Sequence, residues 1–84
     1  MHEVVLSKDA SKTLERLTPE MRRRIISALV KAGTDPLRGK RLRGEMEGLF
    51  SLRIGDMRAV YELDSRKQVI VVHAIGSRGD IYKK

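Results

Sequence analysis

Two arginines beside a predicted β-turn are the residues of this sequence best suited to bind and act on an anion. Residues 49–61 read as two strands joined by Gly55-Asp56, and glycine at the first turn position favours a type II′ hairpin. A two-residue loop fixes the register, so we expect Arg53 to lie opposite Arg58 with both guanidiniums on one face. Like charges directly across a sheet destabilise it. The pair therefore predicts a missing third group, an anion.

The two faces of this hairpin differ in character. One face is apolar and is expected to be covered by helices: Phe50, Leu52, Ile54, Met57, Ala59 and Tyr61. The other face carries Ser51 together with the two arginines and is expected to stay open to solvent. Glu62 shares this open face, so solvated strand residues with balanced charges are the alternative to an anion site.

A second group of cations precedes the hairpin and contains Arg38, Lys40, Arg41 and Arg43. No acid interrupts this group, and its position before the hairpin favours contacts that position a phosphate backbone. Arg43 lies nearest to the predicted sheet, and a solvated loop is the alternative for the whole group. The run Arg22-Arg23-Arg24 is expected to serve surface solubility, because its side chains splay over about 200° on a helix and do not act together.

The C-terminal segment adds two further candidates. Arg78 lies between Gly76 and Gly79, which allow a backbone to turn sharply or to approach a ligand closely. Tyr82 is able to stack on a base, or to exchange a proton if nearby cations lower its pKa. An anchor packed on the sheet is the alternative for Tyr82. His73 falls in an apolar run and is expected to be a packed core residue.

Composition limits the class of protein. The chain has 84 residues, a formal net charge of +7 and no cysteine, and arginine outnumbers lysine. We expect one domain over residues 1–84, with no disulfide, no metal centre and no cofactor. The charge favours nucleic acid or an acidic protein as partner. Neither a signal peptide nor a membrane-spanning run is evident, so we expect a cytoplasmic protein without a membrane partner.

The elements that must position these residues follow from apolar periodicity and helix signals. A strand is expected at residues 4–6, and Ser7 is expected to cap a helix. Thr18 and Pro19 are expected to begin a second helix that ends at Gly33. A loop is expected to run from residue 37 to about 48, before the hairpin and a last strand over residues 68–75. The order βααβββ predicts an α+β fold, with a three-stranded antiparallel meander and both helices on one face of a curved sheet.

Three stretches give the chain a family likeness: Leu42-Arg43-Gly44, residues 52–61 and residues 75–82. They contain the patterns R-x-G-D-x-R-x-x-Y and G-x-R-x-x-x-Y, and with the two-helix start they resemble the RelE/ParE superfamily of type II toxins over nearly the whole chain. The resemblance implies the toxin of a toxin–antitoxin pair, with the RelE-like branch favoured. It implies a ribosome-dependent, metal-independent endoribonuclease that cleaves mRNA in the A site.

The resemblance also implies roles for individual residues. Arg58 would stabilise charge on the transition-state phosphate, and Arg53 would hold that phosphate. Arg78 would stabilise or protonate the leaving oxygen, while Tyr82 would take part in proton transfer and base stacking. The residues expected to bind RNA are Lys40, Arg41, Arg43 and Ser51, the last standing where RelE itself has a lysine.

The expected partners are a RelB-like antitoxin, the ribosome and mRNA. Two alternatives stay open at this point. One is a ParE-like inhibitor of DNA gyrase, which shares the scaffold. The other is a catalytically weak RelE homologue that mainly binds its antitoxin, which the serine at position 51 favours.

Overall fold

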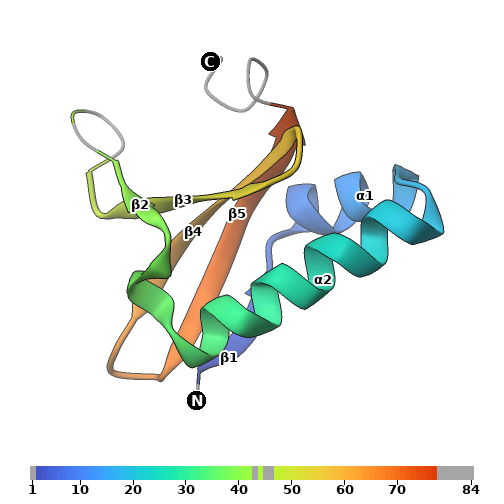
Figure 1. Cartoon of the computed structure of the whole chain (residues 1–84). Coiled ribbons are helices and arrows are strands. Elements are labelled where there is room, and N and C mark those ends of the chain that lie inside the picture. The colour runs from blue at the N-terminus through green and yellow to red at the C-terminus, as the bar shows by residue number, and fades with distance from the viewer. Residues whose placement is uncertain (1, 43, 45–46, 78–84) are drawn as a thin grey trace.

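Two helices cover one face of a twisted five-stranded sheet (Figure 1). The computed structural model describes residues 2–42, 44 and 47–77. The helices are α1 (Lys8–Arg16) and α2 (Pro19–Thr34), and a short 3₁₀ helix, η1, spans Pro36–Arg38. The strands are β1 (Glu3–Leu6), β2 (Lys40–Arg41), β3 (Leu49–Ile54), β4 (Met57–Asp64) and β5 (Val69–Ser77). The expected α+β fold is confirmed, including the meander formed by the last three strands.

Polar caps set the start of both helices, as the sequence indicates. The Ser7 hydroxyl accepts a hydrogen bond from the Ala10 amide at 3.1 Å, and the Thr18 hydroxyl accepts one from Met21 at 3.2 Å. Each bond satisfies a backbone N–H that has no partner within the helix. The Ser7 hydroxyl also donates to the His73 carbonyl at 2.8 Å, so it ties the start of α1 to β5.

The sheet has the strand order β1-β5-β4-β3-β2. The first strand pairs in parallel with β5, and the remaining pairs are antiparallel. The expected hairpin register is confirmed, because Arg53 lies opposite Arg58. Gly55 has a φ of 61° and Asp56 is not among the described residues with positive φ. That combination agrees with a type II′ turn and not with type I′, which needs positive φ at both positions.

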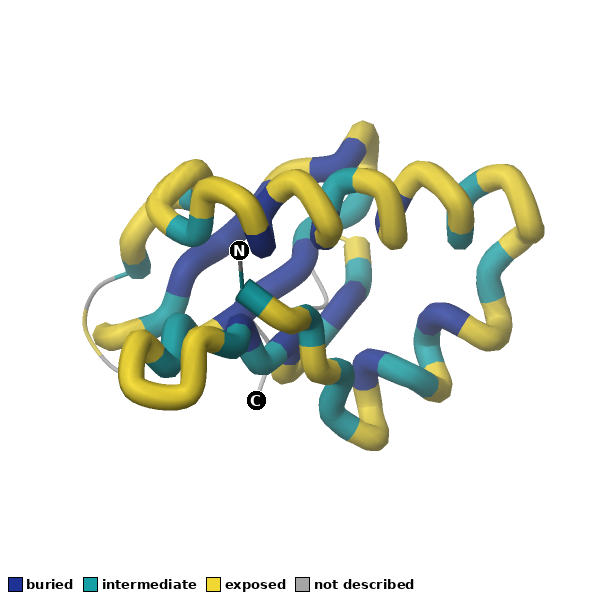
Figure 2. Tube along the Cα trace, turned by 90° about the horizontal axis from the view of Figure 1, so that it is seen from below, coloured by how far each residue is buried: buried dark blue, intermediate teal, exposed yellow. Residues whose placement is uncertain are grey.

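The core lies between the helices and the covered face of the sheet. Its largest fully buried side chains include Tyr61, Ile25, Ile70 and Val72. The apolar hairpin residues join the same cluster as Leu14 and Leu29 of the helices. Figure 2 shows buried segments in the middle of the strands and exposed segments along the outer sides of the helices. The arginine-bearing face of the hairpin is therefore the one that the helices leave uncovered.

The segment between α2 and the hairpin differs from the expected loop. It contains η1 and the two-residue strand β2, which pairs Lys40 with Ser51 and Arg41 with Phe50. Its anchor is the buried phenol of Tyr61, which donates to the Pro36 carbonyl at 2.6 Å and accepts from the Gly39 amide at 3.1 Å. This side chain comes from β4, so local sequence gives no sign of the contact.

Gly33 does not end α2, contrary to expectation, because the helix continues to Thr34 and is followed by Asp35 as its cap. Gly33 is instead a point of close approach. Its carbonyl accepts a hydrogen bond from the His2 amide at 2.7 Å, and an added Cβ would lie 2.6 Å from the His2 carbonyl oxygen. Glycine is therefore needed here for space and not for a left-handed backbone.

Candidate functional site

The two hairpin arginines share one face of the sheet, but different groups hold their side chains. Arg53 is exposed, and its Nε donates to the Gly55 carbonyl at 3.3 Å, toward the turn. Arg58 is partly exposed, and its Nη1 donates to the Ser51 hydroxyl at 3.2 Å, away from the turn. The two head groups therefore lean in opposite directions along the hairpin, which reduces their mutual repulsion and leaves both able to reach an anion.

Ser51 is not an open surface residue, contrary to expectation, since only 3% of it is exposed. Val60, opposite Ser51 on β4, is 1% exposed. This part of the face is therefore buried, whereas Arg53 and Arg58, which lie nearer the turn, are accessible to solvent. The hydroxyl of Ser51 orients the Arg58 side chain by accepting its hydrogen bond. A direct RNA contact by Ser51 stays a prediction that its burial does not favour.

The register separates two cations that the sequence groups together. Lys40 lies opposite Ser51, and directly opposed residues project to the same face, so Lys40 joins Arg53 and Arg58 there. Arg41 lies opposite Phe50 and projects to the other face, where its guanidinium carbon is 5.8 Å from the centre of the Phe50 ring. This distance allows a cation–π interaction. The uncovered face therefore gains Lys40 but not Arg41.

His73 is exposed on the sheet, so its expected place in the core is wrong. A β-bulge causes the difference: Val60 pairs with Ala74 and Tyr61 with Val72, which leaves His73 outside the ladder. Its Nε2 lies 3.0 Å from the Glu62 carboxylate, and the two side chains are 43% and 52% exposed. Glu62 therefore pairs with His73 and does not neutralise the hairpin arginines. No ion pair to either arginine occurs within the part of the chain that the structure describes.

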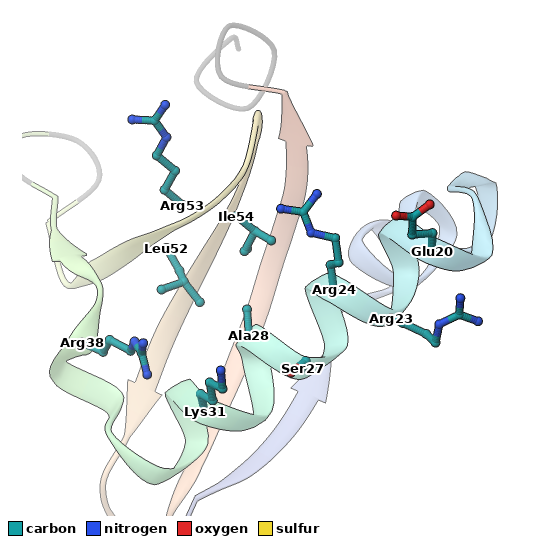
Figure 3. Close-up of a pocket in the computed structure, with 10 residues that line it drawn as sticks. All are labelled: Glu20, Arg23, Arg24, Ser27, Ala28, Lys31, Arg38, Leu52, Arg53 and Ile54. Carbon is teal, nitrogen blue, oxygen red and sulfur yellow. The ribbon is translucent and has the colours of Figure 1, made fainter.

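A cationic groove lies between α2 and the end of β3, with a volume of about 460 Å³ (Figure 3). Its charged lining comprises one acid, Glu20, and five cations: Arg23, Arg24, Lys31, Arg38 and Arg53. Leu52, Ile54 and Ala28 supply an apolar part of the lining. Figure 3 shows Arg24 extending from α2 toward the hairpin, and an added Cβ on Gly55 would lie 3.4 Å from its Nη2. Figure 3 also shows the Arg53 side chain extending away from α2, on the opposite side of β3 from Leu52 and Ile54, so Arg53 lies at the edge of this groove and belongs to the uncovered face.

The arginine run of α2 has more specific roles than the expected one in solubility. Arg23 and Arg24 line the same groove, although their directions along the helix differ. The guanidinium of Arg22 turns back to the end of α1, where it donates to three carbonyls: Leu14 at 3.2 Å, Glu15 at 3.2 Å and Leu17 at 3.1 Å. The Leu14 and Glu15 carbonyls belong to the last turn of α1 and the Leu17 carbonyl to its C-cap, where carbonyls lack their usual helical partners. The Leu14 carbonyl also accepts from the Leu17 amide at 3.2 Å. The short connection from Arg16 to Pro19 brings Arg22 close to the end of α1.

The remaining candidates lie outside the described residues. They are Arg43, Arg78 and Tyr82, so their roles stay predictions from the sequence. Within residues 2–42, 44 and 47–77, no group of three or more histidines or acids is arranged to hold a metal ion. No helix in the same part of the chain is long and apolar enough to cross a membrane.

Tyr61 is the titratable group whose pKa is shifted in the described part of the chain. Desolvation by burial raises the pKa of its phenol, the Gly39 amide acts in the opposite direction, and the charge of Asp35 raises it further. A neutral phenol is able to donate to Pro36 while it accepts from Gly39. Its complete burial and its two backbone partners therefore favour a structural hydroxyl.

Comparisons with known proteins agree on one group of relatives. A family model described as the ParE toxin of the type II toxin–antitoxin system parDE matches residues 4–82. Toxin RelG of Mycobacterium tuberculosis is 36% identical over 81 residues, which span 89% of this chain and 88% of that protein. Toxin RelE of the same organism is 34% identical over 88 residues, with coverage of 98% and 87%.

Solved structures give the same result for the fold. A chain in the crystal structure of the toxin–antitoxin complex RelBE2 from M. tuberculosis matches with a TM-score of 0.84 at 30% identity, covering 92% of this chain and 98% of that one. The isolated E. coli RelE toxin matches with a TM-score of 0.81 at 23% identity, covering 98% of this chain and 92% of that one. At that lower identity the likeness concerns the fold alone.

Proposed function

The chain belongs to the RelE/ParE superfamily of type II toxins, and on this basis we propose that it is a ribosome-dependent endoribonuclease that cleaves mRNA. It is the toxin of a type II toxin–antitoxin system. The proposed reaction takes place in the cytoplasm, in the ribosomal A site. It requires groups that bind one phosphate, stabilise its extra charge and move two protons.

The observation that carries this proposal is the gathering of Arg53, Arg58 and Lys40 on the uncovered face of the sheet. None of these cations forms an ion pair within the described residues. Arginine binds phosphate oxygens through paired N–H donors, and lysine contributes a positive point charge. The face therefore suits a single-stranded RNA backbone, whose phosphates repeat along the strand.

In the proposed step, the 2′-hydroxyl of one nucleotide attacks the adjacent phosphorus. A bond forms between phosphorus and O2′, and the bond from phosphorus to the 5′ oxygen of the next nucleotide breaks. The 2′-hydroxyl gives its proton to the deprotonated phenol oxygen of Tyr82, and the departing oxygen receives a proton from the Arg78 guanidinium. The products are a 2′,3′-cyclic phosphate and a 5′-hydroxyl end, so no water is consumed.

The chain's residues have distinct proposed roles in this step. Arg58, oriented by Ser51, stabilises the charge that grows on the non-bridging oxygens, and Arg53 holds the same phosphate from the turn side. From the sequence pattern alone, we propose that Arg78 stabilises and protonates the leaving oxygen. On the same basis, Tyr82 accepts the proton of the 2′-hydroxyl. Tyr61 is buried and its hydroxyl is bonded to Pro36 and Gly39, which argues against its taking the role of Tyr82.

A RelB-like antitoxin is the proposed protein partner. Related toxins have been solved as complexes named RelBE2 from M. tuberculosis and RelBE from E. coli, both described as toxin–antitoxin complexes. The net charge of +7 on this chain favours an acidic antitoxin segment. Part of that attraction comes from exposed charges, so we expect the affinity to fall as salt concentration rises.

The test uses purified protein and ribosomes paused on a defined mRNA, with primer extension to map cleavage. We expect Arg58→Ala to lower the single-turnover cleavage rate by about 10²–10³-fold, because it removes a transition-state charge. Arg66→Ala is the matched control, since Arg66 is an exposed arginine in the turn between β4 and β5. Cleavage by Arg58→Ala at the wild-type rate would refute the assigned role.

The same preparation separates the two alternatives. The family model that matches this chain is described as the ParE toxin. A ParE-like inhibitor would act on DNA gyrase, so DNA gyrase is the second target to test. Gyrase-dependent DNA breaks without mRNA cleavage would replace the nuclease proposal with a ParE-like one. Tight antitoxin binding with neither activity would indicate a catalytically weak homologue.

A further inference from the structure

The phenol of Tyr61 joins two parts of the chain that are far apart in sequence. Tyr61 is 0% exposed and belongs to β4. Its hydroxyl donates to the Pro36 carbonyl, 25 residues away, at 2.6 Å. The same hydroxyl accepts from the Gly39 amide, 22 residues away, at 3.1 Å. One oxygen atom therefore fixes both ends of the turn that leads into β2.

Besides the Tyr61 hydroxyl, the pairing of β2 with β3 and backbone bonds at the flanks hold this turn. Strand β2 has two residues, and short edge strands contribute little stability by themselves. Backbone bonds fix the neighbours on either side, from Asp35 to the Lys31 carbonyl and from Leu42 to the Leu49 carbonyl. Between them, the Tyr61 hydroxyl supplies the long-range bonds that the structure gives for Pro36 and Gly39.

The phenol is closely packed on both sides. The Tyr61 ring stacks on Phe50 with centroids 5.3 Å apart and an interplanar angle of 10°. A Cβ on Gly39 would lie 2.7 Å from the Tyr61 hydroxyl oxygen, which is closer than real Cβ contacts allow. Glycine at position 39 thus lets the backbone approach near enough to donate its hydrogen bond.

The consequence lies one residue further along the chain. Lys40 follows Gly39 directly and lies opposite Ser51, whose hydroxyl accepts from Arg58 at 3.2 Å. We propose that Tyr61 is a positioning residue that fixes Lys40 beside Ser51 and Arg58, so that Lys40 binds an RNA phosphate next to the one held by Arg58. This inference rests on RNA as the substrate of the proposed function. It assigns Tyr61 no contact with RNA.

The experiment is a double-mutant cycle between Tyr61→Phe and Lys40→Ala. Affinity for a short single-stranded RNA is measured by fluorescence anisotropy at several salt concentrations, without ribosomes. We expect Lys40→Ala to reduce the slope of log affinity against log salt by about 0.7, the value for one lost phosphate contact on a single strand. Tyr61→Phe keeps the ring and is expected to shift the slope in the same direction.

The RNA affinity of the double variant decides whether Tyr61 acts through Lys40. If Tyr61 acts through Lys40, the double variant matches Lys40→Ala, so the two effects are not additive. Additive losses overturn the proposal, as does wild-type RNA affinity in Tyr61→Phe. An RNA affinity that is absent or that Lys40→Ala leaves unchanged also overturns it.

Two further measurements keep the result specific. Amide exchange at Gly39, measured without RNA, is expected to accelerate in Tyr61→Phe and to stay unchanged in the control Thr34→Val, which loses a hydroxyl bond to the Lys31 carbonyl at 2.7 Å. Unchanged exchange in Tyr61→Phe overturns the positioning role.

Gly39→Ala breaks the same contact from the other side and is expected to reproduce the loss of RNA affinity. A non-additive cycle without ribosomal cleavage would refute the nuclease and keep the positioning role.

Discussion

Replacing Arg22 with methionine is expected to destabilise the fold, although this arginine lies far from the uncovered face. Its guanidinium donates three hydrogen bonds to carbonyls at the end of α1, at 3.1–3.2 Å. A charged hydrogen bond contributes about 1.5–3 kcal/mol when it is shielded from water. Arg22 is partly exposed, so we expect the three bonds together to contribute about 1–2 kcal/mol.

The measurement is urea and thermal unfolding of Arg22→Met beside Arg23→Met, which removes the neighbouring charge from the same helix. The Arg22 variant should melt about 5–15 °C below wild type, since 1 kcal/mol corresponds to roughly 4–8 °C in a domain of this size. Arg23 is exposed and lines the groove, so its replacement should change the unfolding free energy by less than about 0.5 kcal/mol. Arg22→Lys should lie between them, because it keeps a charge near the C-terminus of α1 but loses the forked geometry. Equal melting of the two methionine variants would refute the capping role.

Three other perturbations test different contacts. Tyr61→Phe should destabilise the protein by about 1–3 kcal/mol at neutral pH, because it leaves two backbone groups without their partner. Because burial raises the phenol pKa in the folded state, this contribution to stability is complete below about pH 10 and decreases as pH rises through the folded-state pKa. If the difference in unfolding free energy between wild type and Tyr61→Phe stayed constant above pH 10, the raised pKa would be contradicted. Gly33→Ala should lower the free energy of unfolding in urea by about 1–3 kcal/mol, since its Cβ would lie 2.6 Å from the His2 carbonyl oxygen. Unchanged stability would show that β1 shifts to make room. Ser51→Lys should lower stability by about 1–3 kcal/mol because position 51 is 3% exposed, and a stable, more active variant would refute the positioning role given to the serine.

The parts of this fold that the sequence predicts well are those decided by neighbouring residues. The caps at Ser7 and Thr18 and the register of the Gly55-Asp56 hairpin depend on a few adjacent positions, and the structure agrees with all three. The facing arginines follow from the same register. These features can be predicted from sequence because each cap bond and the hairpin turn join residues that are only a few positions apart.

The features that the sequence misses depend on contacts between distant residues. The sequence predicts a loop where strand β2 lies, because nothing local reveals that the Tyr61 hydroxyl anchors the preceding turn. The apolar run predicts His73 in the core, but a bulge leaves it outside the ladder. A bulge reverses which face of the sheet the residues on one side of it project to. Gly33 has the sequence signature of a helix end, yet its role depends on the approach of β1.

For the candidate site, the sequence identifies the right residue types more reliably than their arrangement. Lys40 and Arg41 are adjacent cations, and only the pairing of β2 reveals that they project to opposite faces. The burial of Ser51 is likewise a property of the sheet and not of its neighbours in sequence. The groove cations come from α2, η1 and β3, so no single stretch of sequence contains them.

The parallel pairing of β1 with β5 has a consequence for the order in which this protein is made. Translation produces β1 and both helices first, yet the only strand beside β1 is the last one described. Until Val69–Ser77 has been synthesised, β4 also has one free edge. The basic sheet therefore assembles only after β5 has been synthesised, so both helices leave the ribosome before their sheet is complete.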